Sequence, residues 1–354
     1  MSLLFSELSL RGTTVRNRVW VSPMCQYSSV DGHPTDWHLV HLGGLARGGA
    51  GLVMSEATAV SPEGRISPAD AGIWSDSQAQ GYEPIARFVR DQGAVPGIQL
   101  AHAGRKASTS VPWQGRGYVA PTDGGWPTVG PSALGFDDWP APHALGTAEV
   151  ADVVADFADA ARRASSAGFQ VVEVHAAHGY LLHEFLSPLS NRRTDQYGGS
   201  FDNRVRLLLE VAAAVRVAWP EHQPVFVRLS ATDWVDGGWA LPDTIETSRR
   251  LAAAGVDLVD VSSGGLDAGQ QIPAAPGFQV PFARAVREQV GVATCAVGLI
   301  TEPRQAEQVL ADGSADAVML GRAMLRNPHW PLQAAAELHA AAEWPAQYER
   351  AALL

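Results

Sequence analysis

The segment from His175 to Tyr180 (HAAHGY) carries the side chains best suited to proton-transfer chemistry. It places two imidazoles and one phenol within six residues, at the end of an apolar run typical of a buried strand. An imidazole N–H can donate a hydrogen bond to an oxygen that gains negative charge, and a phenol with a reference pKa of ~10 keeps its proton at neutral pH. The segment therefore predicts His175 and His178 as donors to an anionic oxygen and Tyr180 as a proton source.

A second group of residues indicates a phosphate site. Gly298 and the pair Gly321-Arg322 follow two later strand-like runs. Glycine lets the backbone approach a ligand closely, and arginine offers a fork of N–H donors that suits phosphate oxygens. The same residues also fit tight strand-to-helix turns with an ordinary surface arginine.

The histidine segment permits other interpretations. Each histidine could be a hydrogen-bonded core residue. A metal site is possible because His183 and Glu184 follow closely, but the His-x-His pair that typically opens a metal-dependent barrel hydrolase is absent. A glycosidase would need a second acid besides Glu173, and the run 293–298 offers none. Glu173 precedes His175 by two residues on the same strand face, which favours a supporting role or a barrel layer.

The other polar residues at strand ends are a cysteine, an amide and a cation. They are Cys25, Gln99 and Arg228, and the chain has neither a G-x-S-x-G elbow nor a P-loop motif. Together with the phosphate cradle, this set favours a phosphorylated cofactor that supplies the chemistry, and we assign no metal site.

The elements that must position these side chains form an alternating pattern. Eight short apolar, β-branched runs alternate with helical segments, as expected for parallel strands covered on both faces. No glycine-rich turn follows the first run, which favours a single (β/α)8 TIM barrel over a doubly wound open sheet. The predicted strands are 18–24, 51–58, 95–102, 170–175, 224–230, 257–263, 293–298 and 316–321; the predicted helices are 147–167, with Thr147 as N-cap, 203–219, 242–254, 280–290 and 303–311.

One segment departs from this rhythm. Residues 104–146, after the third strand, contain six prolines and three tryptophans. A connection this long is usually functional or disordered, and the tryptophans argue against disorder. We predict a flap over the catalytic face, with a surface excursion that packs on itself as the alternative. No linker is evident, so residues 1–354 are predicted to form one domain, with 343–354 as a C-terminal tail.

Composition excludes several classes of protein. The chain has 26 basic and 37 acidic residues, a net charge of −11, which argues against a nucleic-acid backbone or an anionic membrane as the main partner. Two cysteines cannot form a disulfide framework or a Cys-rich zinc site. No apolar stretch approaches the roughly 18 residues of a membrane span, and the first residues do not match a signal peptide. We expect a cytoplasmic protein.

Over nearly its whole length the chain resembles the Old Yellow Enzyme family of FMN-dependent ene-reductases, most of all the thermophilic-like bacterial branch. The matching motifs are SPMCQY at 22–27, GLVMSEATAVSPEGR at 51–65, QLAHAGRK at 99–106, HAAHGYLLHEFLSPLSNRRTDQYGG at 175–199, VGLI at 297–300 and GR at 321–322. The cysteine at position 25 and the second histidine at position 178 are typical of that branch.

The resemblance implies that FMN lies across the C-terminal mouth of the barrel. Ser22, Pro23, Met24 and Cys25 would contact the flavin ring, Ala57 and Gln99 its polar edge, Arg228 the N1–O2 side, and Ser263, Gly264, Gly298, Gly321 and Arg322 the ribityl chain and phosphate.

The resemblance also implies a reaction. NADPH or NADH would deliver a hydride to FMN, and an α,β-unsaturated carbonyl compound would then accept it while His175 and His178 bind the carbonyl oxygen and Tyr180 protonates the α-carbon. Tyr27 and Ile66 would line the substrate pocket. Arg350 would reach the site of a neighbouring subunit in a homodimer or homotetramer, or belong to a solvated tail. The alternatives are a non-catalytic flavin-binding protein and a metal-dependent hydrolase using His102, His175, His178 and Glu184.

Overall fold

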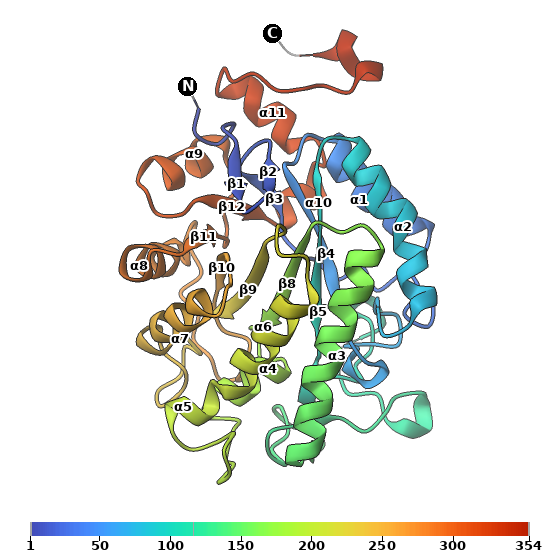
Figure 1. The fold of residues 1–354 in the computed structure, drawn as a ribbon, viewed down its shortest axis with the longest axis vertical. Coiled ribbons are helices and arrows are strands. Elements are labelled where there is room, and N and C mark those ends of the chain that lie inside the picture. The colour runs from blue at the N-terminus through green and yellow to red at the C-terminus, as the bar shows by residue number, and fades with distance from the viewer. Residues whose placement is uncertain (1, 116, 353–354) are drawn as a thin grey trace.

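A closed barrel of eight parallel strands forms the centre of the computed structural model, which describes residues 2–115 and 117–352 (Figure 1). The strands follow one another around the barrel in chain order, and each lies within or overlaps one predicted run, so the predicted (β/α)8 barrel is confirmed. Met1, Arg116, Leu353 and Leu354 belong to the predicted domain range but lie outside the described residues. The barrel strands are β3 (Val19–Val21), β4 (Leu52–Ala59), β5 (Val95–Ala101), β8 (Val171–Ala176), β9 (Val225–Ser230), β10 (Leu258–Ser262), β11 (Ala293–Ala296) and β12 (Ala317–Leu320).

Helices lie around the outside of the barrel between successive strands (Figure 1). Their buried faces are rich in alanine and aliphatic residues, which pack on the outward side chains of the strands. The helices are α1 (Asp36–Arg47), α2 (Asp76–Asp91), α3 (Thr147–Ser166), α4 (Leu181–Leu186), α5 (Phe201–Arg204), α6 (Arg206–Ala218), α7 (Leu241–Ala253), α8 (Val280–Val290), α9 (Pro303–Ala311), α10 (Arg322–Arg326) and α11 (Trp330–Glu337).

Two helix predictions need correction. The N-cap of α3 is Gly146 rather than Thr147, because the Glu149 carboxylate accepts the Gly146 N–H at 2.7 Å and so fixes the helix start one residue earlier. The helix predicted at 203–219 begins earlier and is divided into α5 and α6 at Val205.

The N-terminal end of the barrel is closed by a hairpin. Strands β1 (Leu8–Leu10) and β2 (Thr13–Val15) pair antiparallel, and Val15 packs against the residues that begin the barrel strands. Inside, Trp20 stacks on Phe226 with ring centroids 5.8 Å apart, and both residues are completely buried. This end is therefore filled, and ligands have access only to the opposite mouth, where the strands end.

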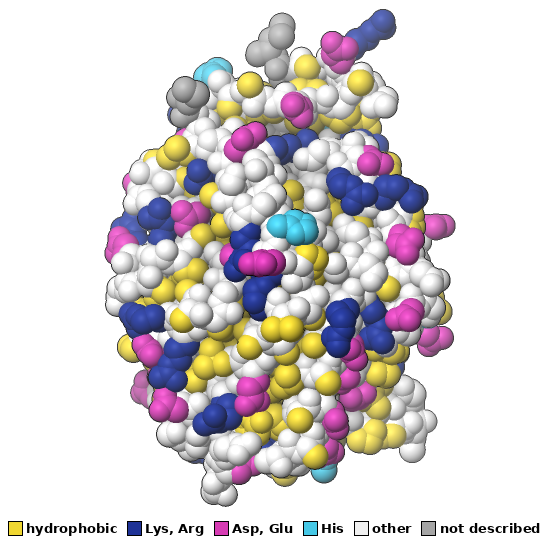
Figure 2. Space-filling model, in the orientation of Figure 1, with side chains coloured by type: hydrophobic (Ala, Val, Ile, Leu, Met, Phe, Trp, Pro, Cys, Tyr) yellow, Lys and Arg dark blue, Asp and Glu magenta, His cyan; other side chains and the backbone are white. Residues whose placement is uncertain are grey.

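The long excursion and the tail extend from opposite parts of the molecule. The excursion contains the short strands β6 (Val129–Gly130) and β7 (His143–Ala144), and the tail forms the 3-10 helix η5 (Ala346–Ala351) beyond α11 (Figure 1). On the face drawn in Figure 2, basic and acidic side chains are interspersed. Within the described ranges, no helix has the length and apolarity needed to cross a bilayer.

The barrel interior predicts a large effect of one core substitution. Phe226→Ala should lower the free energy of unfolding by about 3–5 kcal/mol, because the deleted ring leaves a cavity that the closed strands cannot collapse to fill. Urea unfolding measures the change. Val217→Ala on α6 is the control: its side chain is 88% exposed, and its effect should stay within about 0.5 kcal/mol. Equal effects of the two variants would contradict this interior packing.

Candidate active site

The structure brings the three predicted catalytic side chains together at the end of β8. The ring centroids of His175 and His178 are 5.1 Å apart, and those of His175 and Tyr180 are also 5.1 Å apart. Both ring pairs are nearly perpendicular, with interplanar angles of 84° and 82°. Two imidazoles and a phenol therefore converge on one small volume at the mouth.

Hydrogen bonds define which imidazole nitrogens can donate. Nδ1 of His175 accepts the Ala177 N–H at 3.3 Å, so the proton of its neutral ring lies on Nε2. Nε2 of His178 lies 2.7 Å from Oγ of Ser262, the last residue of β10. When that hydroxyl donates to Nε2, the proton of His178 is on Nδ1. In this arrangement each ring has one N–H left for a ligand.

The surroundings keep these groups in the protonation states that the chemistry needs. Burial, with Arg228 as the next cause, lowers the pKa of His175 and His178 well below the usual value, so both rings are neutral at pH 7. Burial raises the pKa of Tyr180 well above 10, so the phenol keeps its proton.

A polar layer lies directly below the mouth. Gln99 on β5 donates from Nε2 to Oε1 of Glu173 at 2.7 Å, and Nε of Arg228 lies 3.0 Å from Oδ2 of Asp260 in an ion pair. Burial and Asp260 raise the pKa of Glu173 to about 8. Glu173 is thus largely protonated at neutral pH, and it supports Gln99 from within the barrel, consistent with the predicted layer role.

The loop after β3 forms one side of the mouth. Ser22 is buried and donates its N–H to Leu320 O at 3.0 Å, while Pro23, Met24 and Cys25 are half-buried. Met24 Sδ would be 3.5 Å from a Cβ at Gly321, which places this loop beside the end of β12. Burial, followed by the nearby Asp70 and Glu56, raises the pKa of the Cys25 thiol, which disfavours a nucleophilic thiolate.

An irregularity in β4 aligns Ala57 with Gln99. The register between β4 and β5 shifts between Ser55 and Ala57, so Ala57 pairs with Gln99. Glu56 lies at this irregularity. Its carboxylate accepts the Gln26 N–H at 2.8 Å and thereby holds the loop after β3. The sequence pattern gave no indication that Glu56 holds this loop.

The predicted phosphate residues lie around a cavity of about 210 Å³. Gly298, Gly321 and Arg322 line it, together with Arg326. Ser263 donates to Oε1 of Gln279 at 2.6 Å. Gly298 has a φ of +116°, and a Cβ there would lie 2.6 Å from Gln279 Nε2, so glycine is required.

The sequence did not identify three further residues of this region, Ser230, Ser262 and Gln279. Ser230 and Ser262 end β9 and β10, so the strand-end rule could have identified them. Ser230 connects the segment after β8 with the loop after β10. Its Oγ accepts the His178 N–H and donates to the carbonyl of Gly264, which has a φ of +70°. Gln279, just before α8, had no signal in the sequence.

The excursion packs against the mouth. Trp113 is edge-on to Tyr27 at 5.9 Å, and Thr109 N–H donates to Ile66 O at 2.7 Å. Phe136 lies 4.7 Å from Nζ of Lys106. The predicted substrate residues Tyr27 and Ile66 are therefore both in contact with the excursion, although its action as a flap stays a prediction.

Arg350 does not join the other site residues within one chain. It is exposed on η5, whose Tyr348 ring is 6.0 Å from His329 and lies under Arg47 at 5.2 Å. Arg47 ends α1 shortly before β4 begins, so it lies at the end of the barrel opposite the mouth.

The ligand set proposed for a metal-dependent hydrolase is not assembled. In the part of the chain that the structure describes, no three His, Cys, Asp or Glu side chains are grouped to hold a metal ion. His102 and Glu184 instead accept backbone N–H groups of Gly104 and Arg105.

Known proteins resemble this chain in sequence and in fold. The sequence model of the NADH:flavin oxidoreductase / NADH oxidase family matches residues 3–340. An NADPH dehydrogenase of Geobacillus thermodenitrificans is 48% identical over 352 residues, which cover 99% of this chain and 98% of that protein.

The chain belongs to the NADH:flavin oxidoreductase / NADH oxidase family. Solved structures agree with this. Morphinone reductase in complex with tetrahydroNAD is 30% identical with a TM-score of 0.79, over 97% of this chain and 92% of that one. The Old Yellow Enzyme homologue from Zymomonas mobilis is 28% identical with a TM-score of 0.78, over 96% and 94%. The predicted Old Yellow Enzyme resemblance is confirmed.

The residues at the mouth fit FMN, the cofactor of this family. FMN joins an amide-like ring edge to an anionic phosphate, and the structure provides an amide at Gln99 and a buried cation at Arg228. The cavity with Gly298, Gly321 and two arginines offers close backbone approach and positive charge for a phosphate. As a family member, the chain is an FMN-dependent oxidoreductase.

The depressed imidazole pKa values can be measured directly. We expect neither His175 nor His178 to gain a proton as the pH falls from ~8 to ~6, because burial and Arg228 disfavour the imidazolium form. NMR of isotope-labelled histidine measures this, with His175→Gln and His178→Gln used for assignment. A protonation step of either ring within this range would contradict the electrostatic description.

Proposed function

We propose that the protein is an ene-reductase that takes a hydride from NADPH or NADH and reduces the C=C bond of α,β-unsaturated carbonyl compounds. The observation that carries the proposal is the convergence of two neutral imidazoles and a protonated phenol at the mouth, with ring centroids 5.1 Å apart. The similarity to an NADPH dehydrogenase and to morphinone reductase supports it.

The two imidazoles polarise the substrate. His175 through Nε2 and His178 through Nδ1 donate hydrogen bonds to the carbonyl oxygen, which draws electron density from the conjugated bond and makes the β-carbon electrophilic. Because the Ala177 N–H holds the His175 ring and Ser262 Oγ holds the His178 ring, these donors are oriented before the substrate binds. Removal of one such donor typically costs about 10²–10³ in rate.

Tyr180 supplies the proton. Its phenol stays protonated because burial raises its pKa, and it lies beside the His175 ring, so it can protonate the α-carbon as the enolate forms. Lys106 Nζ lies 5.2 Å from the centre of the Tyr180 ring, and this cation–π contact helps to hold the ring in place.

When bound, FMN supplies the hydride chemistry between the nicotinamide and the second substrate. The residues that hold it are Ser22, Pro23, Met24, Cys25, Ala57, Gln99 and Arg228 around the ring, and Ser263, Gly264, Gly298, Gly321 and Arg322 around the ribityl chain and phosphate. Arg228, paired with Asp260 at 3.0 Å, would place a fixed positive charge beside the flavin ring, which would favour its reduction.

Tyr27 and Ile66 border the substrate under the excursion. We assign Arg350 to the site of a neighbouring subunit, because η5 lies at the opposite end of its own barrel. The homodimer or homotetramer and the cytoplasmic location stay predictions.

An anaerobic two-step assay tests the proposal. The purified protein should be yellow, NADPH should bleach the flavin absorbance, and 2-cyclohexenone should restore it. Tyr180→Phe should keep the bleaching by NADPH and slow the reaction with the enone by about 10²–10⁴, since only the second step needs the proton. A protein that takes up no FMN would refute the proposal, and a Tyr180→Phe enzyme as fast as wild type would favour a non-catalytic flavin-binding protein.

Removal of the tail tests the assignment of Arg350. A chain ending before Tyr348 should show a KM for the enone about tenfold higher, since a charge-assisted hydrogen bond contributes about 1.5–3 kcal/mol. Steady-state kinetics and sedimentation measure the KM and the oligomer size. Glu349→Gln, which leaves the arginine in place, is the control. Unchanged kinetics and size after truncation would remove the assignment.

A further inference from the structure

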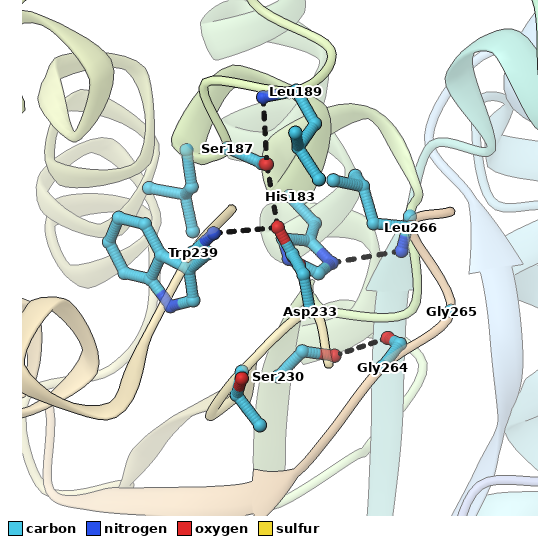
Figure 3. Close-up of polar contacts among 12 residues, drawn as sticks. His183, Ser187, Leu189, Ser230, Asp233, Trp239, Gly264, Gly265 and Leu266 are labelled. Atoms are coloured by element: carbon cyan, nitrogen blue, oxygen red, sulfur yellow. Dashed lines mark hydrogen bonds and ion pairs between the residues drawn. The ribbon is translucent and has the colours of Figure 1, made fainter. Parts of the chain in front are cut away.

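Two completely buried residues next to the active site have no role in the mechanism above. His183 on α4 and Asp233 in the loop after β9 lie with Nε2 and Oδ1 2.9 Å apart (Figure 3). We propose that they are positioning residues, which fix the turn from His178 to Tyr180 through the Gly179 N–H and thereby set where the His178 and Tyr180 rings lie. The inference rests on the proposed function.

The turn needs support because its backbone is unfavourable. His178 has a φ of +60° and Gly179 a φ of +73°, so two successive residues occupy the left-handed region. A residue with a Cβ rarely adopts this conformation unless its surroundings enforce it. The turn also lies close to the next loop, since a Cβ at Gly179 would be 2.2 Å from Gly265 O.

Each backbone N–H of the turn has its own partner. The His178 N–H donates to Ser230 Oγ at 3.0 Å, the Tyr180 N–H to Ala177 O at 3.2 Å, and the Gly179 N–H to His183 Nδ1 at 2.9 Å. On the other side, Lys106 Nζ donates to His178 O and Gly265 O, each at 2.8 Å. His183 is therefore the acceptor for the central N–H of the strained turn.

Asp233 determines which nitrogen of His183 can accept. Since Nδ1 receives the Gly179 N–H, the proton of the neutral ring is on Nε2, the nitrogen that lies 2.9 Å from Asp233 Oδ1. The other carboxylate oxygen accepts from Ser187 Oγ and from the Trp239 N–H, both at 2.7 Å (Figure 3).

Two donors thus meet one carboxylate oxygen, and His183 Nε2 lies 2.9 Å from the other. Burial alone would raise the pKa of Asp233, but the adjacent His183, Ser187 and the Trp239 N–H lower it, so the group stays ionised. An ionised Asp233 accepts only, which holds the His183 proton on Nε2 and leaves Nδ1 free to accept.

The pair is separated from any ligand. Both side chains have no exposed surface, so they act through the backbone of Gly179 and not on the substrate. Loss of the acceptor leaves the Gly179 N–H without a partner in a buried turn. The turn should then relax from its left-handed conformation and move both rings.

The first test is the tautomer of His183 in the wild-type holoenzyme. NMR with ¹⁵N-histidine should show an unprotonated Nδ1 and a protonated Nε2. A protonated Nδ1 would overturn the proposal, because that nitrogen could not accept the Gly179 N–H.

The second test compares variants that differ in this one contact. His183→Leu removes the acceptor, and Asp233→Asn lets an amide donate to Nε2, which shifts the proton to Nδ1. Both should weaken the binding of phenol about tenfold, which its charge-transfer absorbance with the flavin measures. Both should also lower kcat with 2-cyclohexenone about 10²-fold, as expected for misplaced groups. His183→Gln, whose amide can accept and donate, should recover most of both.

Tyr197→Phe is the matched control: it removes a hydrogen bond to Glu210 beside α4 and keeps the ring that packs on Phe185, and it should behave like wild type. Variants at His183 and Asp233 that bind phenol as Tyr197→Phe does would overturn the inference. Failure of the wild-type enzyme itself to reduce the enone would instead refute the proposed function. FMN content and melting temperature, measured for each variant, identify any general loss of folding.

Discussion

The ion pair between the buried Arg228 and Asp260 is the interaction on which the rest of the mouth depends. A charge inside a barrel is strongly unfavourable unless a partner is near, and Asp260 on the adjacent strand provides one at 3.0 Å. With that pair in place, Arg228 adds to the effect of burial and keeps His175 and His178 neutral. In the proposed function the same cation would lie beside the bound flavin ring. One ion pair would then act on both the cofactor side and the substrate side of the site.

The barrel makes such an arrangement possible because its two ends are used differently. The end closed by the β1–β2 hairpin is filled by apolar side chains such as Trp20 and Phe226, which supply packing. The interior becomes polar one layer higher, with Gln99 and Glu173, and only the last residues of the strands face a ligand. Stability and chemistry are thus separated along the barrel axis.

The turn after β8 shows how a strained backbone is kept at a functional site. Its left-handed residues are unfavourable alone, and hydrogen bonds from three other segments compensate, through Ser230, His183 and Lys106. These contacts tie the turn to β9, to α4 and to the start of the excursion. Small movements of any of them would alter the spacing between the imidazole and phenol rings.

The sequence by itself determined the barrel and the chemical character of its mouth. Apolar strand runs and the HAAHGY segment are local patterns, readable because parallel strands are buried on both faces and because chemistry lies at their ends. Only the tertiary structure decided that Ser262 contacts His178, that Gln279 accepts from Ser263, and that Asp233 lies beside His183 fifty residues away. Such contacts join distant segments, and no spacing along the chain encodes which buried polar groups the closed barrel will bring within hydrogen-bond distance.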